Sequence, residues 1–215
     1  SKVKALLAEE TGAEFDETLD SVWATVAAQI DQSLNAFSRS RLNHILADIF
    51  ALYPAEIVAD YVLVPLLKSL GIQNVGHAAK RAFLCSVLQE YLQAAIYRQR
   101  QAGQKDSVFI VSLCPDAGAL ESLILQFSML THQYHADYLG HLDAREALIC
   151  VEALQPTIVV LAGYGSLPSS DLQSYLRVWR EKNNLPVIVA GDAALVYPAL
   201  NLPSTNDVHA CVAMQ

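Results

Sequence analysis

The chain has 215 residues, and 53% of them are hydrophobic, so it can bury a substantial core and is not a disordered segment. Its formal net charge is -8, with 22 acidic against 14 basic residues, and such a surface repels the phosphates of nucleic acids. No apolar run reaches the ~20 residues that cross a bilayer, and no signal-peptide pattern is present, so we expect a cytoplasmic protein.

The cysteines also argue for a reducing compartment. Cys85, Cys114, Cys150 and Cys211 are far apart and form no CxxC pair, which favours free thiols over a disulfide framework or a zinc site. The sequence begins at Ser1, without Met, in a segment with helical periodicity. We therefore expect it to be a piece of a longer protein.

Helical periodicity dominates the first hundred residues. Residues 1–9 predict a short helix, and apolar residues from Phe15 to Phe37 recur at steps of three and four, which predicts one long amphipathic helix. Ser40 is the predicted N-cap of the next helix, whose inner face ends at Phe50.

Two more helices are expected before the composition changes. Pro54 suits the first turn of a third helix that ends at Gly71, and Pro65 should kink that helix or start a new segment. A fourth helix spans roughly residues 76–101. Four helices with short connections predict a small bundle over residues 13–102.

Strands and helices alternate from residue 103 onward. The predicted strands are residues 108–113, 134–139, 157–161, 186–190 and 208–212, and the predicted helices are residues 119–130, 144–154, 170–182 and a short one near Ala193. Five β/α units predict a five-stranded, parallel, doubly wound sheet. The predicted class is therefore α/β, with an N-terminal four-helix bundle and a Rossmann-like domain over residues 103–215.

The first strand and its loop lead to a candidate ligand site. Val108 to Leu113 is a continuous apolar run, typical of a buried strand, and the loop that follows precedes a helix. Ligands of such sheets bind at the carboxyl ends of the strands. The small and polar residues of three such loops are our candidates for ligand binding: Cys114, Asp116, Gly118, Gly163, Ser166, Gly191 and Asp192. For any single loop the commoner role of Gly and Asp is to form turns and caps.

Several enzyme motifs are missing. The first strand is not followed by G-x-G-x-x-G, the third strand does not end in Asp, and residues 163–166 do not form a G-x-S-x-G elbow. These absences argue against a dinucleotide enzyme, a phospho-acceptor receiver and an α/β hydrolase. We therefore name no catalytic residue.

Histidines gather around the second predicted strand. His132, His135 and His141 lie near Asp137, and His135 should share one strand face with Asp137. Metal or haem ligation is one interpretation, but solvated or capping histidines are the commoner case, so we name no metal ligand. Cys114 could be a reactive thiol near a helix N-terminus, although a small core residue is the simpler interpretation.

Three short segments carry a resemblance to a known family. They are residues 1–7, Pro65-Leu66-Leu67 with Gly71, and Tyr138-Leu139-Gly140. With a bundle ahead of an α/β domain, they resemble the effector half of MerR-family transcription regulators with a cobalamin-binding-type sensor, most similar to the type that controls curli and biofilm genes in enteric bacteria. The resemblance implies that residues 1–12 end a linker helix from a missing DNA-binding domain. It also implies that the full-length homodimer binds DNA through that domain alone, and that the bundle caps the ligand edge.

The chain departs from that family at the cofactor. Cobalamin binders carry an Asp/Glu-x-His-x-x-Gly loop after the first strand, and alignment on Asp116 places Gly118 at the position of the cobalt-ligating His. The light-sensing relatives also have a Trp and a Glu-His pair in the bundle, where this chain has Lys80-Arg81 and no Trp nearby. Glycine has no side-chain donor, so we expect no bound cobalamin.

Three functions stay open at this point. The leading hypothesis is the regulatory domain of a MerR-like regulator that is not an enzyme and has no cofactor, with an unknown small molecule as a possible ligand. The second is a stand-alone sensor or anti-repressor that binds cobalamin or haem, and the third is a corrinoid-dependent transferase. We expect the bundle to collapse partly onto the space left by the glycines of the sheet edge, since no obvious ligand anchor remains there. An open cavity of about 300 Å³ or more between bundle and sheet would instead favour a sensor of a small molecule.

Overall fold

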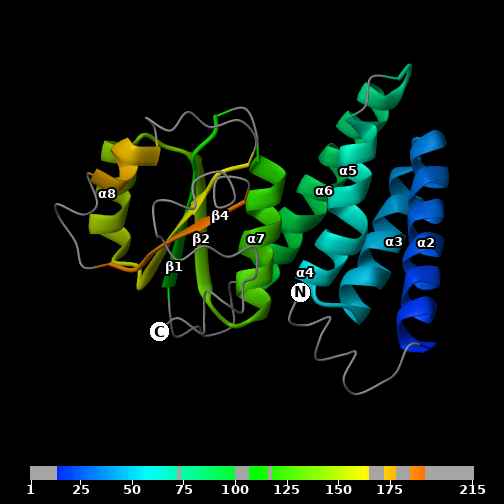
Figure 1. Ribbon diagram of the computed structural model, residues 1–215, viewed down its shortest axis with the longest axis horizontal. Helices are drawn as coiled ribbons and strands as arrows, with labels where there is room; N and C mark the ends of the chain where they lie inside the picture. The colour runs from blue at the N-terminus through cyan, green and yellow to red at the C-terminus, as the bar shows by residue number, and fades with distance from the viewer. Residues whose placement is uncertain are drawn as a thin grey trace. The chain divides into compact units, whose positions relative to one another are not determined.

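The computed structural model describes residues 14–71, 74–99, 107–115, 118–164, 172–177 and 185–191, with the backbone alone for residues 14–20 (Figure 1). The chain divides into two compact units between Leu88 and Gln89. We call them the helical unit, up to Leu88, and the α/β unit, from Gln89. The predicted boundary near residue 102 and the predicted linker helix of residues 1–12 lie outside the described residues and stay predictions.

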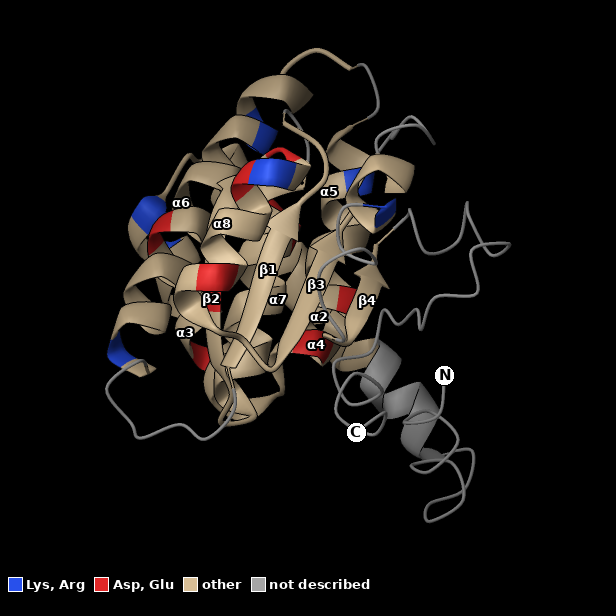
Figure 2. Ribbon diagram, turned by 90° about the vertical axis from the view of Figure 1, so that its left-hand side faces the viewer, with Lys and Arg blue, Asp and Glu red and all other residues tan. Residues whose placement is uncertain are grey.

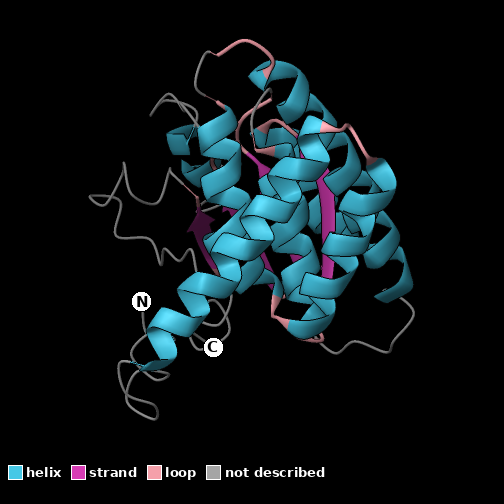
Figure 3. Cartoon of the chain, turned by 90° about the vertical axis from the view of Figure 1, so that its right-hand side faces the viewer, coloured by secondary structure: helices cyan, strands magenta, loops and turns pink. Residues whose placement is uncertain are grey.

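Every described element before the first strand is helical (cyan in Figure 3). The elements are α2 (Glu14–Asn35), α3 (Arg39–Leu52), α4 (Ala55–Val58), the π-helix η1 (Ala59–Leu63), α5 (Val64–Leu70) and α6 (His77–Gln99). The expected apolar stripes are buried over most of their described length, with Trp23, Ile30 and Leu34 on α2 and Leu42 and Leu46 on α3. Phe37, the last residue of the first stripe, lies past the end of α2 and is 51% exposed. Because α6 passes from one unit into the other, a bundle of four complete helices stays a prediction.

The predicted N-cap of α3 is wrong by two residues. The helix begins at Arg39 and its N-cap is Ser38, whose side chain makes no capping hydrogen bond. The chain reverses at Phe37, which takes a left-handed φ of 46°, and the Phe37 ring packs edge-on against Phe83 at 5.4 Å. This early reversal leaves Ser40 inside the first helical turn, where it cannot act as the cap.

Pro65 starts a new helical segment, as predicted. It lies in the first turn of α5, directly after the π-turn of η1. A proline has no N–H to donate, and its ring collides with the carbonyl four residues earlier, here that of Tyr61. The wider π-turn contains Tyr61 and is a known way to absorb such a mismatch without breaking the helix. Gly71 then ends the segment, also as predicted, although with an ordinary right-handed φ of -73°.

The α/β unit contains a parallel sheet of four described strands. They are β1 (Ser107–Ser112), β2 (His135–His141), β3 (Ile158–Ala162) and β4 (Val187–Ala190), in the order β2-β1-β3-β4 (Figure 2). The helices α7 (Ala119–Thr131) and α8 (Ala144–Leu154) lie on opposite sides of the sheet (Figure 1). Residues 172–177 are helical within the predicted helix 170–182, and the predicted strand 208–212 lies outside the described residues.

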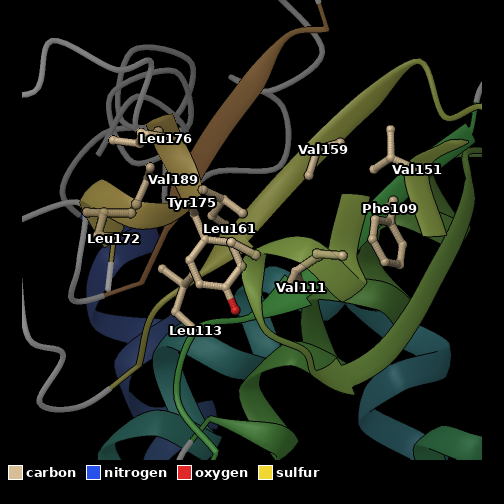
Figure 4. Packing of buried hydrophobic residues seen from close by; sticks show 12 residues of the cluster. Phe109, Val111, Leu113, Val151, Val159, Leu161, Leu172, Tyr175, Leu176 and Val189 are labelled. Carbon is tan, nitrogen blue, oxygen red and sulfur yellow. The ribbon is translucent and has the colours of Figure 1, made fainter. Parts of the chain in front are cut away.

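One face of the sheet holds a large apolar core (Figure 4). Alternate residues of the strands, such as Phe109, Val111 and Leu161, pack there against α8 and residues 172–177. Tyr175 is buried in this cluster, and its hydroxyl donates a hydrogen bond to the Leu142 carbonyl. The pattern explains why β1 and β3 read as unbroken apolar runs, since both faces of a doubly wound sheet are covered. Among the described helices, none is long and apolar enough to span a membrane.

Candidate functional site

The candidate site lies where β1, β3 and β4 end. The three strand ends are tied together by backbone hydrogen bonds, from Leu113 N–H to the Ala162 carbonyl at 2.9 Å and from Gly163 N–H to the Ala190 carbonyl at 3.0 Å. The chain places β2 on one side of β1 and β3 on the other. The loops after β1 and β3 therefore diverge at the point where sheets of this kind bind their ligands.

The structure describes four of the seven candidate residues. Cys114 is buried directly after β1, Gly118 is the N-cap of α7, Gly163 follows β3 and Gly191 follows β4. The other three candidates, Asp116, Ser166 and Asp192, lie outside the described residues, so their role stays a prediction.

Two of the described candidates, Gly118 and Gly191, face one side chain, that of Tyr164. A Cβ atom added at Gly118 would lie 2.7 Å from the Tyr164 Cβ and 2.9 Å from its Cδ2. A Cβ added at Gly191 would lie 2.8 and 2.9 Å from Cδ1 and Cε1 of the same ring. One edge of the tyrosine ring thus faces Gly118 and the other edge faces Gly191.

The backbone conformation at Gly118 and Gly191 also favours glycine. Gly118 has a φ of 83° and Gly191 a φ of 80°, a region that other residues rarely adopt. At Gly191 an added Cβ would also lie 2.7 Å from the Gly163 carbonyl oxygen, so the loops after β3 and β4 touch through their main chains. The small residues at this edge serve a close packing of loops around Tyr164.

The expected closure of the bundle over the sheet edge concerns the placement of one unit on the other and stays a prediction. At Gly118 and Gly191, the side chain that takes the space is Tyr164, which comes from the edge itself. The residue stood in the sequence beside a predicted candidate, Gly163, but no local pattern indicated that it would lie between two other loops.

The described residues do not fit a corrinoid held through a histidine below cobalt. Gly118, which the sequence alignment on Asp116 places at the position of the histidine of cobalamin binders, has no donor atom, and Tyr164 occupies the space into which any side chain would extend. Within the described part of the chain, no group of three or more His, Cys, Asp or Glu side chains could hold a metal ion.

Cys114 has the surroundings of a core residue. It is 7% exposed, its N–H lies 3.4 Å from the Ser112 hydroxyl, and that hydroxyl donates to the Cys114 carbonyl at 2.9 Å. A nucleophilic thiol needs access to its substrate. The position therefore favours the core interpretation over the reactive one.

A polar group that the sequence did not suggest lies between β1, β2 and α7. Burial raises the pKa of Tyr138, while the hydroxyls of Ser122 and Ser112 lower it in part and the charge of Glu121 adds to the rise. His141 Nδ1 lies 3.0 Å from the Ser112 carbonyl oxygen at the same strand ends. The available signal was the pair of serines that interrupt apolar segments at residues 112 and 122.

The predicted histidine cluster is only partly formed. His135 and Asp137 do share one strand face, with Nε2 and Oδ2 3.1 Å apart. His132 instead follows the last turn of α7, and His141 contacts the end of β1. The structure brings together one His–Asp pair rather than three ligands.

The solved structures that resemble this chain share little of its sequence. No protein-family model matches the sequence, and no curated protein matches it. A solved cobalamin-binding protein from Desulfitobacterium hafniense is 15% identical, with 83% of this chain and 90% of that chain covered and a TM-score of 0.40. The methanol:cobalamin methyltransferase complex from Methanosarcina barkeri is 14% identical, with 79% and 68% covered and a TM-score of 0.39.

Proposed function

We propose that this chain is the regulatory part of a MerR-like transcription regulator that works without a corrinoid and without catalysis. The observation that supports the second half of the proposal is the position of Tyr164, between Gly118 and Gly191. A side chain packed there takes the place that a ligand would need at the switch point of the sheet. The α/β unit would then act through its folded surface, as a module for assembly or protein contacts.

The regulator half of the proposal rests on sequence resemblance. Residues 1–7, residues 65–71 and residues 138–140 carry it, and a helical unit precedes an α/β unit as it does in that family. In this proposal a DNA-binding domain ahead of Ser1 binds DNA, and the full-length protein is a cytoplasmic homodimer. Two-fold symmetric operators require such a dimer.

Cobalamin binding is the direct test of the cofactor-free role. The protein is incubated with hydroxocobalamin, passed through a gel-filtration column and examined by absorbance. We expect no corrinoid to travel with the protein, and a stoichiometric corrinoid spectrum would overturn the proposal. A parallel incubation with haem tests the sensor alternative, which a Soret band of bound haem would favour.

A variant tests whether the Tyr164 ring or the missing donor at Gly118 keeps a corrinoid from binding. Tyr164→Ala removes the ring from between the two glycine loops without adding a ligand for cobalt. We expect Tyr164→Ala to remain free of corrinoid, because Gly118 still offers no donor. A corrinoid bound to Tyr164→Ala alone would show that the ring excludes it. The regulator half is tested separately by the DNA sequence upstream of Ser1. A coding region for a winged helix is expected there, and a start codon directly before Ser1 would overturn that half alone.

A further inference from the structure

The helical unit carries an open groove that none of the functions above uses. It lies where α5 is followed by α6 (Figure 1) and has a volume of about 720 Å³. This volume falls within the range of roughly 300–1,000 Å³ that small-molecule sites occupy. Its walls are formed mainly by Leu70, Val75, Ala78, Arg81, Ala82 and Cys85.

The sequence of α6 explains the groove. Ala78, Arg81, Ala82 and Cys85 follow one another at steps of three, one and three, so they lie on one face of the helix. Two of these four residues are alanines, which leave the space that larger side chains would fill. Val75, which also lines the groove, is fully exposed.

Arg81 gives this apolar groove a positive charge. The neighbouring Lys80 is paired, with its Nζ 3.8 Å from Asp31 Oδ1. Within the described part of the chain, no carboxylate pairs with Arg81, and the first turn of α6 contains no acidic residue. In a chain of net charge -8, this is a local positive site beside an apolar surface. A guanidinium in such a position suits a carboxylate.

We propose that this groove binds a small amphipathic acid. The carboxylate would bind Arg81, and an apolar body would cover Leu70, Val75 and the two alanines. The site lies wholly in the helical unit, so it is independent of the proposed function, which concerns the sheet edge. Loss of either conclusion leaves the other untouched.

Alkylation of two cysteines can report whether the groove is occupied. Cys85 lines the groove and is partly exposed, and Cys150 is partly exposed on α8 in the other unit. With decanoate as the probe, alkylation of Cys85 should slow while alkylation of Cys150 should not, as followed by mass spectrometry of the two peptides. Equal protection of both cysteines, or of neither, would overturn the proposal.

Probes of different charge test the role of Arg81. Decanoate should bind in isothermal titration, and decylammonium and decanol should bind more weakly, since they lack the carboxylate. Arg81→Gln should weaken decanoate binding about fivefold, the effect of losing one exposed charge pair. Arg98→Gln, at an exposed arginine on the same helix but outside the groove, is the matched control and should leave binding unchanged.

A third variant tests whether the space in the groove is needed for binding. Ala82→Leu places a larger side chain in the groove at an exposed helix position, where the fold should tolerate it. It should abolish the protection of Cys85 by decanoate while the circular dichroism spectrum stays that of the unaltered protein. If Ala82→Leu binds decanoate as well as the unaltered protein does, or if decylammonium binds equally well, the groove is not an acid-binding site.

Discussion

Gly118 and Tyr164 are packed so closely that a single methyl group at residue 118 would stand 2.7 Å from the tyrosine Cβ. The two residues are separated by 46 positions in the chain, and they meet because β1 and β3 are neighbours in the sheet. Their contact joins the N-terminus of α7 to the chain just after β3. While the tyrosine holds this place, the loops after β1 and β3 are joined by packing and offer no space there.

Gly118→Ala should therefore destabilise the protein strongly. The alanine must adopt a φ of 83°, and its methyl group must displace Tyr164 or the α7 N-terminus. Strain of this kind and overpacking each cost about 1–3 kcal/mol, so we expect the free energy of unfolding to fall by about 3 kcal/mol. Urea denaturation followed by circular dichroism measures the loss.

Gly140 provides a matched control for that experiment. It has a φ of 90°, yet an added Cβ would meet no atom within 4 Å. Gly140→Ala should thus show the backbone strain alone, about 1 kcal/mol. In a Tyr164→Gly background, which removes the Cβ as well as the ring, the cost of Gly118→Ala should approach that of Gly140→Ala. A cost that does not change in that background would mean that the contact with Tyr164 contributes nothing.

The N-terminus of α8 gives a pH-dependent prediction. Asp143 Oδ1 accepts hydrogen bonds from the N–H groups of Arg145 at 2.8 Å and Glu146 at 2.9 Å, in a capping box. The hydrogen bond from Glu146 N–H, followed by that from Arg145, holds the pKa of Asp143 below its ordinary value of 3.8. Asp143→Ala should lower stability at pH 7, because two N–H groups lose their acceptor.

The sign of the pH effect follows from the lowered pKa. The ionised cap stabilises the fold above pH 3.8, and its contribution is lost as the pH falls through the lowered pKa of the folded state. The difference between the unaltered protein and Asp143→Ala should therefore shrink in acid. Asp143→Asn is the control, because its amide oxygen still accepts the bonds but does not ionise. A difference for Asp143→Ala that stays constant from neutral pH into acid would contradict the assignment.

The regular elements of the α/β unit could be predicted because their signals are local. Runs of apolar residues located β1 and β3 within a residue of their observed ends, and α8 matches its predicted span. The second strand extends to His141, two residues past its predicted end. Periodicity alone did not indicate that its polar final residues continue the strand.

The site was harder to predict because it depends on contacts between distant residues. Small residues after β1, β3 and β4 could be recognised from the sequence, but nothing local indicated that Tyr164 would fill the space between them. The N-cap of α3 was missed for a related reason. The chain reverses at Phe37, whose ring packs against Phe83, a residue far away in sequence.

Residues 1–215 alone should not bind duplex DNA at physiological salt. The net charge is -8, and Figure 2 shows basic residues interspersed with acidic ones along the helices, as with Arg145 and Glu146 on α8. DNA-binding surfaces instead gather Lys and Arg on one face. A gel-shift titration with several duplexes should show no complex, with a known helix-turn-helix protein on its own operator as the positive control. Salt-sensitive, sub-micromolar binding by residues 1–215 would contradict this expectation.

Tyr138 provides a prediction in the alkaline range. Burial, the largest cause, raises the pKa of its phenol above 10.0, so the folded state holds the proton more tightly than the unfolded state does. The stabilisation is fully present below pH 10.0 and is lost as the pH rises through the pKa of the folded state. At pH 7, Tyr138→Phe removes a half-buried neutral hydroxyl and should cost at most about 1 kcal/mol. That cost should decrease above pH 10.0, since phenylalanine cannot ionise. Tyr97→Phe, at a tyrosine that is 70% exposed, is the control and should change stability little. A Tyr138→Phe cost that is the same on both sides of pH 10.0 would show that the phenol is not held in its neutral form by the fold.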